Sequence, residues 1–508
     1  MALQSRVLMP LGAIRRDSSA AWPAPPVHAG PCARKVPRWL STALFVAPPI
    51  AVVVGWVATA SVPVGYYASY ALAQAVTLIA AILGAINMRR SLSTQPLVAA
   101  LWLLFFVAYP LKLYVIAIAD SGMQEAFLPV VSQAGQTPRI LAAASSVTAW
   151  TFLSISCVMV VLSKRKARTT HGSGMASIGS DRLLSGLCLA SFVALVASLV
   201  QWHYNIALMG ALANDLPFRL AGWTVYVQIA FVPTFILCLI YRAESVKRRA
   251  FTGAALALLL CHAALYQAQT ASRGYVLSVV LLVGFYWAAQ RQLTSRRIAY
   301  AAVIVVLIIG LRPFLTLVRY SRVLGNMEMS DSFGNAYEST IHSSSPFGAF
   351  PAAALGSILR LTGSDGLVLA VSRPLDGSPF DNMKYLYNDP TRPSARVFTQ
   401  DWVGSFSPRT QFAPGLVTMF YLVGGTLLAS VGMASVLVLA ALGWGYLVTQ
   451  PKRIYGSVAA AVLGANAVVV VMEGDLDQLP VRAAAYTASL LFAQWFFGGR
   501  LREKSLGG

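Results

Sequence analysis

Residues 301–310 read AAVIVVLIIG, a run without a single polar side chain. Such a run is typical of a helix in the hydrocarbon of a bilayer, whereas a strand of a membrane β-barrel alternates between polar and apolar residues. The rest of the chain has the same character: 57% of its 508 residues are hydrophobic and only 11% are charged. Charged residues make up about a quarter of an average soluble domain. The sequence therefore predicts an all-α, polytopic integral membrane protein.

Apolar runs of about 20 residues, the length that a helix needs to cross a bilayer, occur along most of the chain. The run at 250–290 is too long for one crossing, and Ser272, Arg273 and Gly274 form its only plausible turn. The run at 413–449 is also too long, so we expect its beginning, FAPGLVTMFYLVGG, to be bent, tilted or re-entrant. We predict about twelve crossings, at 39–60, 65–87, 96–118, 140–162, 183–203, 220–241, 250–271, 274–290, 298–316, 416–449, 454–472 and 481–499.

The basic residues set the orientation, because Lys and Arg are retained on the cytoplasmic side of a membrane. With twelve crossings, one side receives 25 of the 39 basic residues and only four acidic residues. This side includes the clusters KRKAR, KRR, RQLTSRR and RLREK. Both termini are therefore predicted to be cytoplasmic. The same distribution explains the net charge of +21 without nucleic acid as a partner.

The predicted crossings divide the chain into five parts. Residues 1–37, rich in Pro, Ala and Arg, form a disordered cytosolic tail. Residues 38–316 hold nine crossings, 317–412 form a large external loop, 413–499 hold three more crossings and 500–508 form a second tail. A connection as long as 317–412 is usually functional or disordered. Because parts of it have helical apolar spacing, we expect it to be partly folded. The five cysteines show no metal-ligand spacing, and we expect neither metal nor cofactor.

Arginines collect on the predicted external side, although the charge bias of membrane proteins disfavours them there. Each alone is explained by a side chain that reaches the interface or pairs with an external acid. As a set they also fit an anionic ligand, because guanidinium groups bind phosphate oxygens in bidentate geometry. The candidates for binding a diphosphate are Arg273, Arg312, Arg319 and Arg409.

Several short motifs follow one another between 252 and 425. ASRG lies at the turn of a hydrophobic hairpin, RLTGSDGL lies in the external loop, and FAPGLVTMFYLVGG begins the next crossing. In this order the chain resembles the Wzy-type oligosaccharide repeat-unit polymerases, which are related to the O-antigen ligases. The resemblance covers about a third of the sequence.

The resemblance implies transfer of a growing glycan from undecaprenyl diphosphate to a new lipid-linked repeat unit, at the outer face of the inner membrane. A chain-length regulator and a flippase would be partners. The chemistry needs cations for the leaving diphosphate and a base for the attacking hydroxyl. As catalytic residues we select Asp365 and Arg360, which share one motif, and His342, since histidine titrates near neutral pH. Glu338 and Asp401 are further candidates for the base. An Asp in GSDG is also common as a turn or capping residue.

Three other interpretations stay open. An O-antigen ligase shares the topology but uses another acceptor, and a transporter with twelve helices suits termini on one side, although the chain shows no convincing internal repeat. Asp475 and Asp477 form a D-x-D pattern that binds divalent cations in some glycosyltransferases.

Lys112 lies inside the third crossing, about two turns from Asp120, and a charge there is costly enough to indicate a function or an acidic partner.

Overall fold

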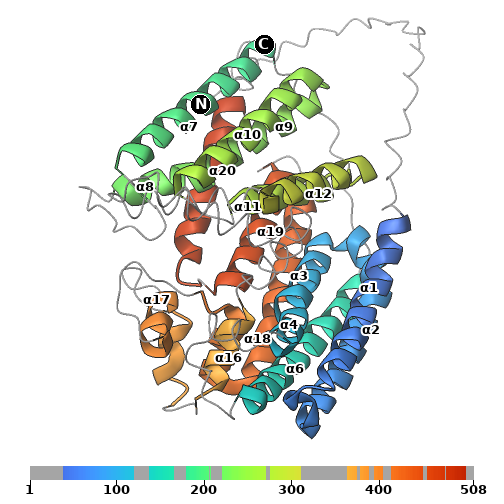
Figure 1. The fold of residues 1–508 in the computed structure, drawn as a ribbon. Helices are drawn as coiled ribbons and strands as arrows, with labels where there is room; N and C mark the ends of the chain where they lie inside the picture. Colours follow the sequence, from blue (N-terminus) through green and yellow to red (C-terminus); the bar gives the residue numbers. More distant parts are fainter. Residues whose placement is uncertain are drawn as a thin grey trace, which may run out of the picture.

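The structure, a computed structural model, describes most of the predicted crossings and three pieces of the predicted external loop (Figure 1). The described residues are 38–118, 137–164, 179–204, 206, 220–270, 275–310, 363–373, 378–387, 394–403, 413–449, 455–474 and 476–498. Within these ranges the regular structure is helical throughout, as the sequence predicts, and strands do not occur.

In this described part, nine helices are long and apolar enough to span a membrane. The chain is therefore a helical, multi-pass membrane protein. Seven of the nine spans lie before residue 271, and two lie after residue 415. They are α1 (Arg38–Thr59), α2 (Ala68–Thr94), the continuous α3 (Pro96–Phe106), η2 (Val107–Leu111) and α4 (Lys112–Ile118), α6 (Thr137–Ser163), α7 (Ser180–His203), the continuous α8 (Leu220–Tyr226), η4 (Val227–Phe231) and α9 (Val232–Ser245), α10 (Arg249–Thr270), α18 (Leu416–Thr449) and α19 (Gly456–Glu473).

The other three predicted crossings correspond to helices that are shorter or less apolar than these nine. They are α11 (Tyr275–Ala289), α12 (Ser295–Gly310) and α20 (Leu479–Gly498). With 15 residues, α11 is about 22 Å long, less than the hydrocarbon thickness of about 30 Å. The total of twelve crossings thus stays a prediction. The split of 250–290 into two helices is confirmed, because α10 ends at Thr270 and α11 begins at Tyr275.

The overlong run at 413–449 contains a break. The backbone of Gly424 (φ −149°, ψ 27°) and Gly425 (φ 64°, ψ −157°) is not helical, which divides α18 into a short first part and a long second part. Gly425 lies in the left-handed region, where a side chain would be strained. The expected bend at the beginning of this run is therefore confirmed, and two glycines form it.

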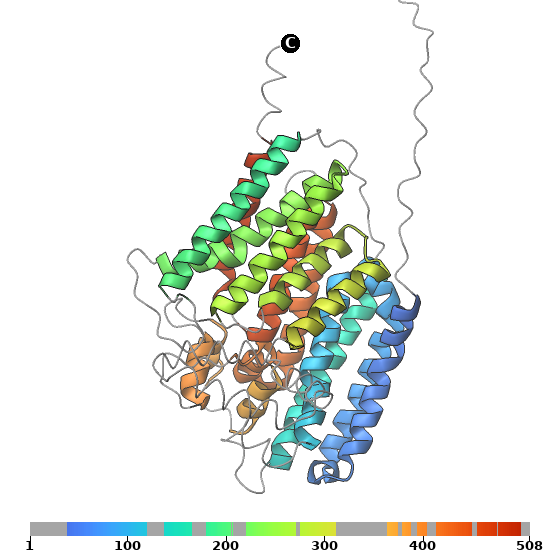
Figure 2. The same ribbon diagram turned by 45° about the horizontal axis from the view of Figure 1, so that its top comes forward.

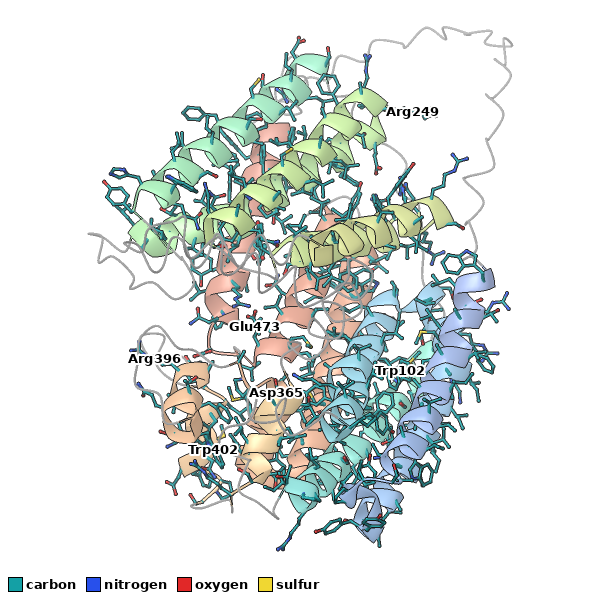
Figure 3. All side chains as sticks on the ribbon, viewed as in Figure 1. Trp102, Arg249, Asp365, Arg396, Trp402 and Glu473 are labelled. Atoms are coloured by element: carbon teal, nitrogen blue, oxygen red, sulfur yellow. The ribbon has the colours of Figure 1, made fainter. Side chains whose placement is uncertain are left out.

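The first helices pack closely because small residues face large aromatic ones. Trp102 of α3 is completely buried, and its Nε1 donates to Ser156 Oγ of α6 at 2.8 Å. A methyl group on Gly84 of α2 would lie 2.2 Å from the Trp102 ring. Only glycine permits this approach, as is common between membrane helices. Figure 3 labels Trp102 among the helices of this group.

Two spans contain a π-helical turn at their middle. In η2 the turn contains Pro110, and η4 ends two residues before Pro233. A proline removes one backbone donor and displaces the preceding turn, so neighbouring carbonyl groups lose their helical partners. These carbonyls become acceptors for side chains of other helices, which is one reason why π-turns often occur at functional sites.

Within the predicted external loop, the structure contains four short helices: α16 (Ser364–Val371), η5 (Asp381–Tyr385), α17 (Ser394–Phe398) and η6 (Thr399–Val403). Helix α16 packs against α6 and α18, and six of its eight residues are buried. Figures 1 and 2 both show α16 and α17 near one end of the bundle. Arg249, at the start of α10, lies toward the other end (Figure 3).

Candidate functional site

A buried ion pair joins α4 to α16. Lys112 Nζ donates to Asp365 Oδ2 at 2.6 Å, and the exposed fractions of the two side chains are 0% and 14%. The lysine was notable in the sequence because a charge inside a crossing is costly. Its partner among the described residues is Asp365, 253 positions away, and the nearby Asp120 lies outside the described residues. The most favoured catalytic candidate is thus paired with a cation inside the helix bundle.

Glycines allow α16 to approach its neighbours. A methyl group on Gly366 would lie 2.4 Å from the Pro414 carbonyl oxygen, and one on Gly363 would lie 2.8 Å from Tyr109 Cζ. Gly363 also has φ +140°, which favours glycine. The two glycines of GSDG, Gly363 and Gly366, therefore serve close packing, and this packing sets the position of Asp365. The Asp of this motif is not the capping residue, because Gly363 is the N-cap and Asp365 is the second residue of α16.

Burial raises the pKa of the Asp365 carboxyl, and the charge and hydrogen bond of Lys112 oppose this shift. A carboxyl group with a raised pKa is a better proton acceptor than an exposed one, because its conjugate acid forms closer to neutral pH. The pair therefore holds Asp365 in one position while burial keeps it basic. Such a group can act as a general base.

A polar cavity of about 220 Å³ lies between the middle of the η4–α9 span and helices α10, α11, α19 and α20. Its lining includes an ion pair, Arg482 with Glu473, at 3.4 Å between Nη2 and Oε2. The exposed fractions are 17% for the Arg482 side chain and 44% for Glu473. Hydroxyl and amide groups of Tyr266, Tyr275 and Asn466 also line it. Tyr275 Oη and Asn466 Nδ2 already donate to the carbonyl oxygens of Gln228 and Val462, so the cavity offers chiefly the Arg482 guanidinium to an anionic ligand.

The cavity and the buried ion pair are linked by a tight backbone contact. Gly415, just before α18, has φ +81°, and a methyl group on it would lie 2.9 Å from Gly363 Cα and 3.4 Å from the Met472 carbonyl oxygen. Met472 directly precedes Glu473, and Gly363 lies two residues before Asp365. Figure 3 shows Glu473 at the end of α19 that faces the α16 region. The two charged groups therefore belong to one region of the protein.

A hydrogen-bond network continues from the cavity into the bundle. Tyr275 Oη donates to the Gln228 carbonyl oxygen at 2.8 Å, and His262 Nε2 lies 3.0 Å from the same oxygen. Gln228 belongs to the π-turn η4, which leaves its carbonyl available. His262 is buried, and its contact with Gln228 joins α10 to η4. Tyr275 is the first residue of α11, so this network fixes the start of that helix.

The two other acidic candidates in the described residues have structural partners. Asp401 Oδ2 accepts from Lys384 Nζ at 2.8 Å and from Tyr385 Oη at 2.9 Å, which ties η6 to η5. Asp477 is buried, and its Oδ2 accepts from the Ser394 backbone N–H at 2.8 Å. Asp477 therefore holds the start of α17 against the α19–α20 turn. This contact does not favour the metal interpretation of D-x-D, whose first residue, Asp475, lies outside the described part.

The structure describes only one of the seven predicted site residues, Asp365. The other six lie outside the described residues. They are Arg273, Arg312, Arg319, His342, Arg360 and Arg409. Glu338, a further candidate for the base, also lies outside them. Sequence reasoning missed the cavity and its ion pair, because no motif connects Glu473 to Arg482. In the described ranges, no group of three or more His, Cys, Asp or Glu side chains could hold a metal ion.

Three comparisons with known proteins found no relative of this chain. The chain matches no protein-family model, no curated protein and no solved structure. The function must therefore be argued from the chemistry of the ion pair and the adjacent cavity.

Proposed function

We propose that this protein is a membrane glycosyltransferase that polymerises undecaprenyl-diphosphate-linked oligosaccharide repeat units for a bacterial polysaccharide. One observation carries the proposal: a carboxyl group that burial makes basic, Asp365, lies in the same region as a polar cavity with the Arg482 guanidinium. Transfer of a glycan from a lipid diphosphate needs both kinds of group.

In the proposed reaction, Asp365 accepts the proton of the attacking sugar hydroxyl while the bond from the anomeric carbon to the diphosphate breaks. Charge then develops on the leaving diphosphate oxygens, and fixed cations stabilise it. Arg482 supplies one such cation, and Arg273, Arg312, Arg319, Arg360 and Arg409 are proposed as others. Lys112 does not touch substrate in this scheme. It is a positioning residue that holds Asp365.

The membrane topology forms part of the same proposal. Twelve crossings with both termini in the cytoplasm put residues 317–412 at the periplasmic face of the inner membrane. Lipid-linked repeat units are available to a polymerase at that face after a flippase has delivered them. A reporter fused near Asn388, active only when exported, tests this orientation, and cytoplasmic activity there would invert it.

The test of function compares two carboxylates of the same segment in the source bacterium. The chromosomal gene is deleted and replaced by wild type, Asp365→Asn or Asp381→Asn. Asp381 is the matched control, because it is an exposed carboxylate whose partner is the nearby Ser378. We expect the deletion strain and Asp365→Asn to make glycan with single repeat units, and Asp381→Asn to make long chains. Immunoblots of the membranes verify equal protein levels.

Two outcomes would overturn the proposal. Long chains in the Asp365→Asn strain at normal protein level would remove the base from the mechanism. Loss of all ligated glycan, single units included, would favour the ligase interpretation, because a polymerase defect leaves the transfer of single units intact.

A further inference from the structure

A second cavity, of about 440 Å³, lies between α10, α11 and α12, and its lining is almost entirely apolar. Its walls include Leu256 and Leu260 of α10, Val280 and Val283 of α11 and Ile304 of α12. The volume lies in the range of about 300 to 1,000 Å³ that is common for small-molecule sites, and such sites are mostly apolar with a few polar groups. An elongated apolar group fits this chemistry.

Polar side chains line one end of this cavity. Arg297 Nη2 lies 3.5 Å from Glu244 Oε1, and the Arg297 guanidinium lies over the Trp287 ring at 4.9 Å from its centroid. Tyr286 Oη donates to Glu244 Oε2 at 2.6 Å. These contacts hold Arg297 in one position while its side chain stays 27% exposed. The guanidinium is therefore fixed and accessible at the border between apolar walls and water.

Cations outnumber acids in the chain segments that contain Glu244 and Arg297. Besides Arg297, the surrounding helix ends expose basic side chains, and Glu244 is the only acid in 241–249 and 289–300. The exposed basic residues are Lys247, Arg248, Arg249, Arg291 and Arg296. Figure 3 shows Arg249, at the start of α10, toward the opposite end of the bundle from Asp365. Of the residues that line this cavity, Val279 alone also lines the cavity that contains Arg482.

We propose that this cavity binds an anionic phospholipid of the surrounding membrane, with an acyl chain between α10, α11 and α12 and the headgroup phosphate at Arg297 and its basic neighbours. Basic pockets between membrane helices bind anionic headgroups in this way. A zwitterionic lipid has no net charge to match the excess of cations, and a free phosphate has no apolar part to contact the walls. The site does not depend on the proposed reaction, and it requires only that the protein lies in a bilayer.

The test measures lipid binding to the purified full-length protein in detergent by native mass spectrometry. Palmitoyl-oleoyl phosphatidylglycerol is compared with palmitoyl-oleoyl phosphatidylcholine, which has the same acyl chains and no net charge. Ala301→Trp inserts an indole ring into the cavity, since Ala301 lines it. Ala302→Trp is the matched control, because Ala302 is exposed and does not line it. We expect wild type and Ala302→Trp to retain one phosphatidylglycerol, and Ala301→Trp to lose it.

A charge variant provides a second arm that leaves the helix packing intact. Arg248, Arg249 and Arg296 are exposed, so their joint replacement by Gln does not disturb the core. Each removed arginine should weaken phosphatidylglycerol about fivefold and leave phosphatidylcholine unchanged. Equal retention of the two lipids by wild type, or unchanged preference in the triple variant, would overturn the proposal. If Ala301→Trp does not fold, the triple variant alone decides.

Discussion

Replacement of Lys112 by Met should destabilise the protein through Asp365 rather than through lost packing. Methionine nearly fills the volume of the lysine stem and places an apolar group where the side chain is completely buried. The change leaves the Asp365 carboxyl in the bundle without the cation that lies 2.6 Å away. An unpaired buried charge is the main cost of breaking such a pair.

The expected magnitude follows from burial. Removal of one partner of a buried ion pair costs about 3 to 5 kcal/mol, whereas a neutral hydrogen bond between membrane helices is worth only about 0.6 kcal/mol on average. Asp365 keeps 14% of its side chain exposed, so we expect a loss near the lower limit, about 3 kcal/mol. The double variant Lys112→Met with Asp365→Asn removes both charges. It should recover most of the lost stability.

The same reasoning predicts a pH dependence with a definite sign. Burial raises the pKa of Asp365 in the folded protein, and removal of Lys112 eliminates the cation that opposes this shift. In the Lys112→Met variant the folded state then binds a proton at pH values where the unfolded chain, with a carboxyl pKa of about 3.9, has released it. The variant's stability must fall as pH rises from about 4 through the raised pKa. Acid should therefore reduce its deficit, and the double variant should not show this effect.

The assay is unfolding in mixed micelles of dodecyl maltoside and sodium dodecyl sulfate, followed by tryptophan fluorescence at pH 4.5 and pH 7.5. Wild type, both single variants and the double variant form a double-mutant cycle, which isolates the pairwise energy. A loss below about 1 kcal/mol for Lys112→Met, or a double variant as unstable as Lys112→Met, would refute the argument that an unpaired buried carboxylate carries the cost.

Three further changes test neighbouring parts of the region. Gly415→Ala should lower the free energy of unfolding by about 2 kcal/mol, because φ is +81° and the new methyl group would lie 2.6 Å from Tyr109 Oη. Gly222 has open space around it, so Gly222→Ala should not destabilise the protein in the same micelle titration. Arg482→Gln should shorten the glycan and lower polymerisation about tenfold in the complementation strain. Arg139 is an exposed arginine of α6, and Arg139→Gln should have no effect. Equal activity of the two variants would remove Arg482 from the mechanism. Asp477→Ala should speed amide hydrogen exchange at Ser394, whose N–H loses its acceptor at 2.8 Å, and unchanged exchange would show that α17 is held by other contacts.

The helices were predictable because their signal is local. Apolar runs and overlong stretches depend only on composition and length, so the split between α10 and α11 and the break at Gly424 and Gly425 followed from the sequence. Helix ends were less accurate: the crossing predicted at 65–87 corresponds to α2, which continues to Thr94 past Arg89 and Arg90. Charges mark where a crossing leaves the hydrocarbon, but a helix can continue into water.

The site was only partly predictable because its contacts are long-range. The cost of a charge inside a crossing indicated that Lys112 needs a function or a partner, yet this argument cannot choose among distant acids, and Asp365 is 253 positions away. The π-turn at Gln228 has a local signal in Pro233, but the side chains that contact its carbonyl group come from other helices. The pair between Glu473 and Arg482 also depends on how helices pack and has no sequence motif.

The two ion pairs of the region differ in how easily an anionic substrate could replace the carboxylate. Lys112 is completely enclosed, so exchange of Asp365 for another anion would require the bundle to open. Glu473 keeps 44% of its side chain exposed and meets Arg482 at 3.4 Å, and an ion pair as exposed as this is worth at most about 1 kcal/mol. A diphosphate can therefore take the place of Glu473 at Arg482 while the carboxylate turns toward water. In the proposed reaction, the enclosed pair would therefore position the base, and the exposed pair would bind the leaving group reversibly.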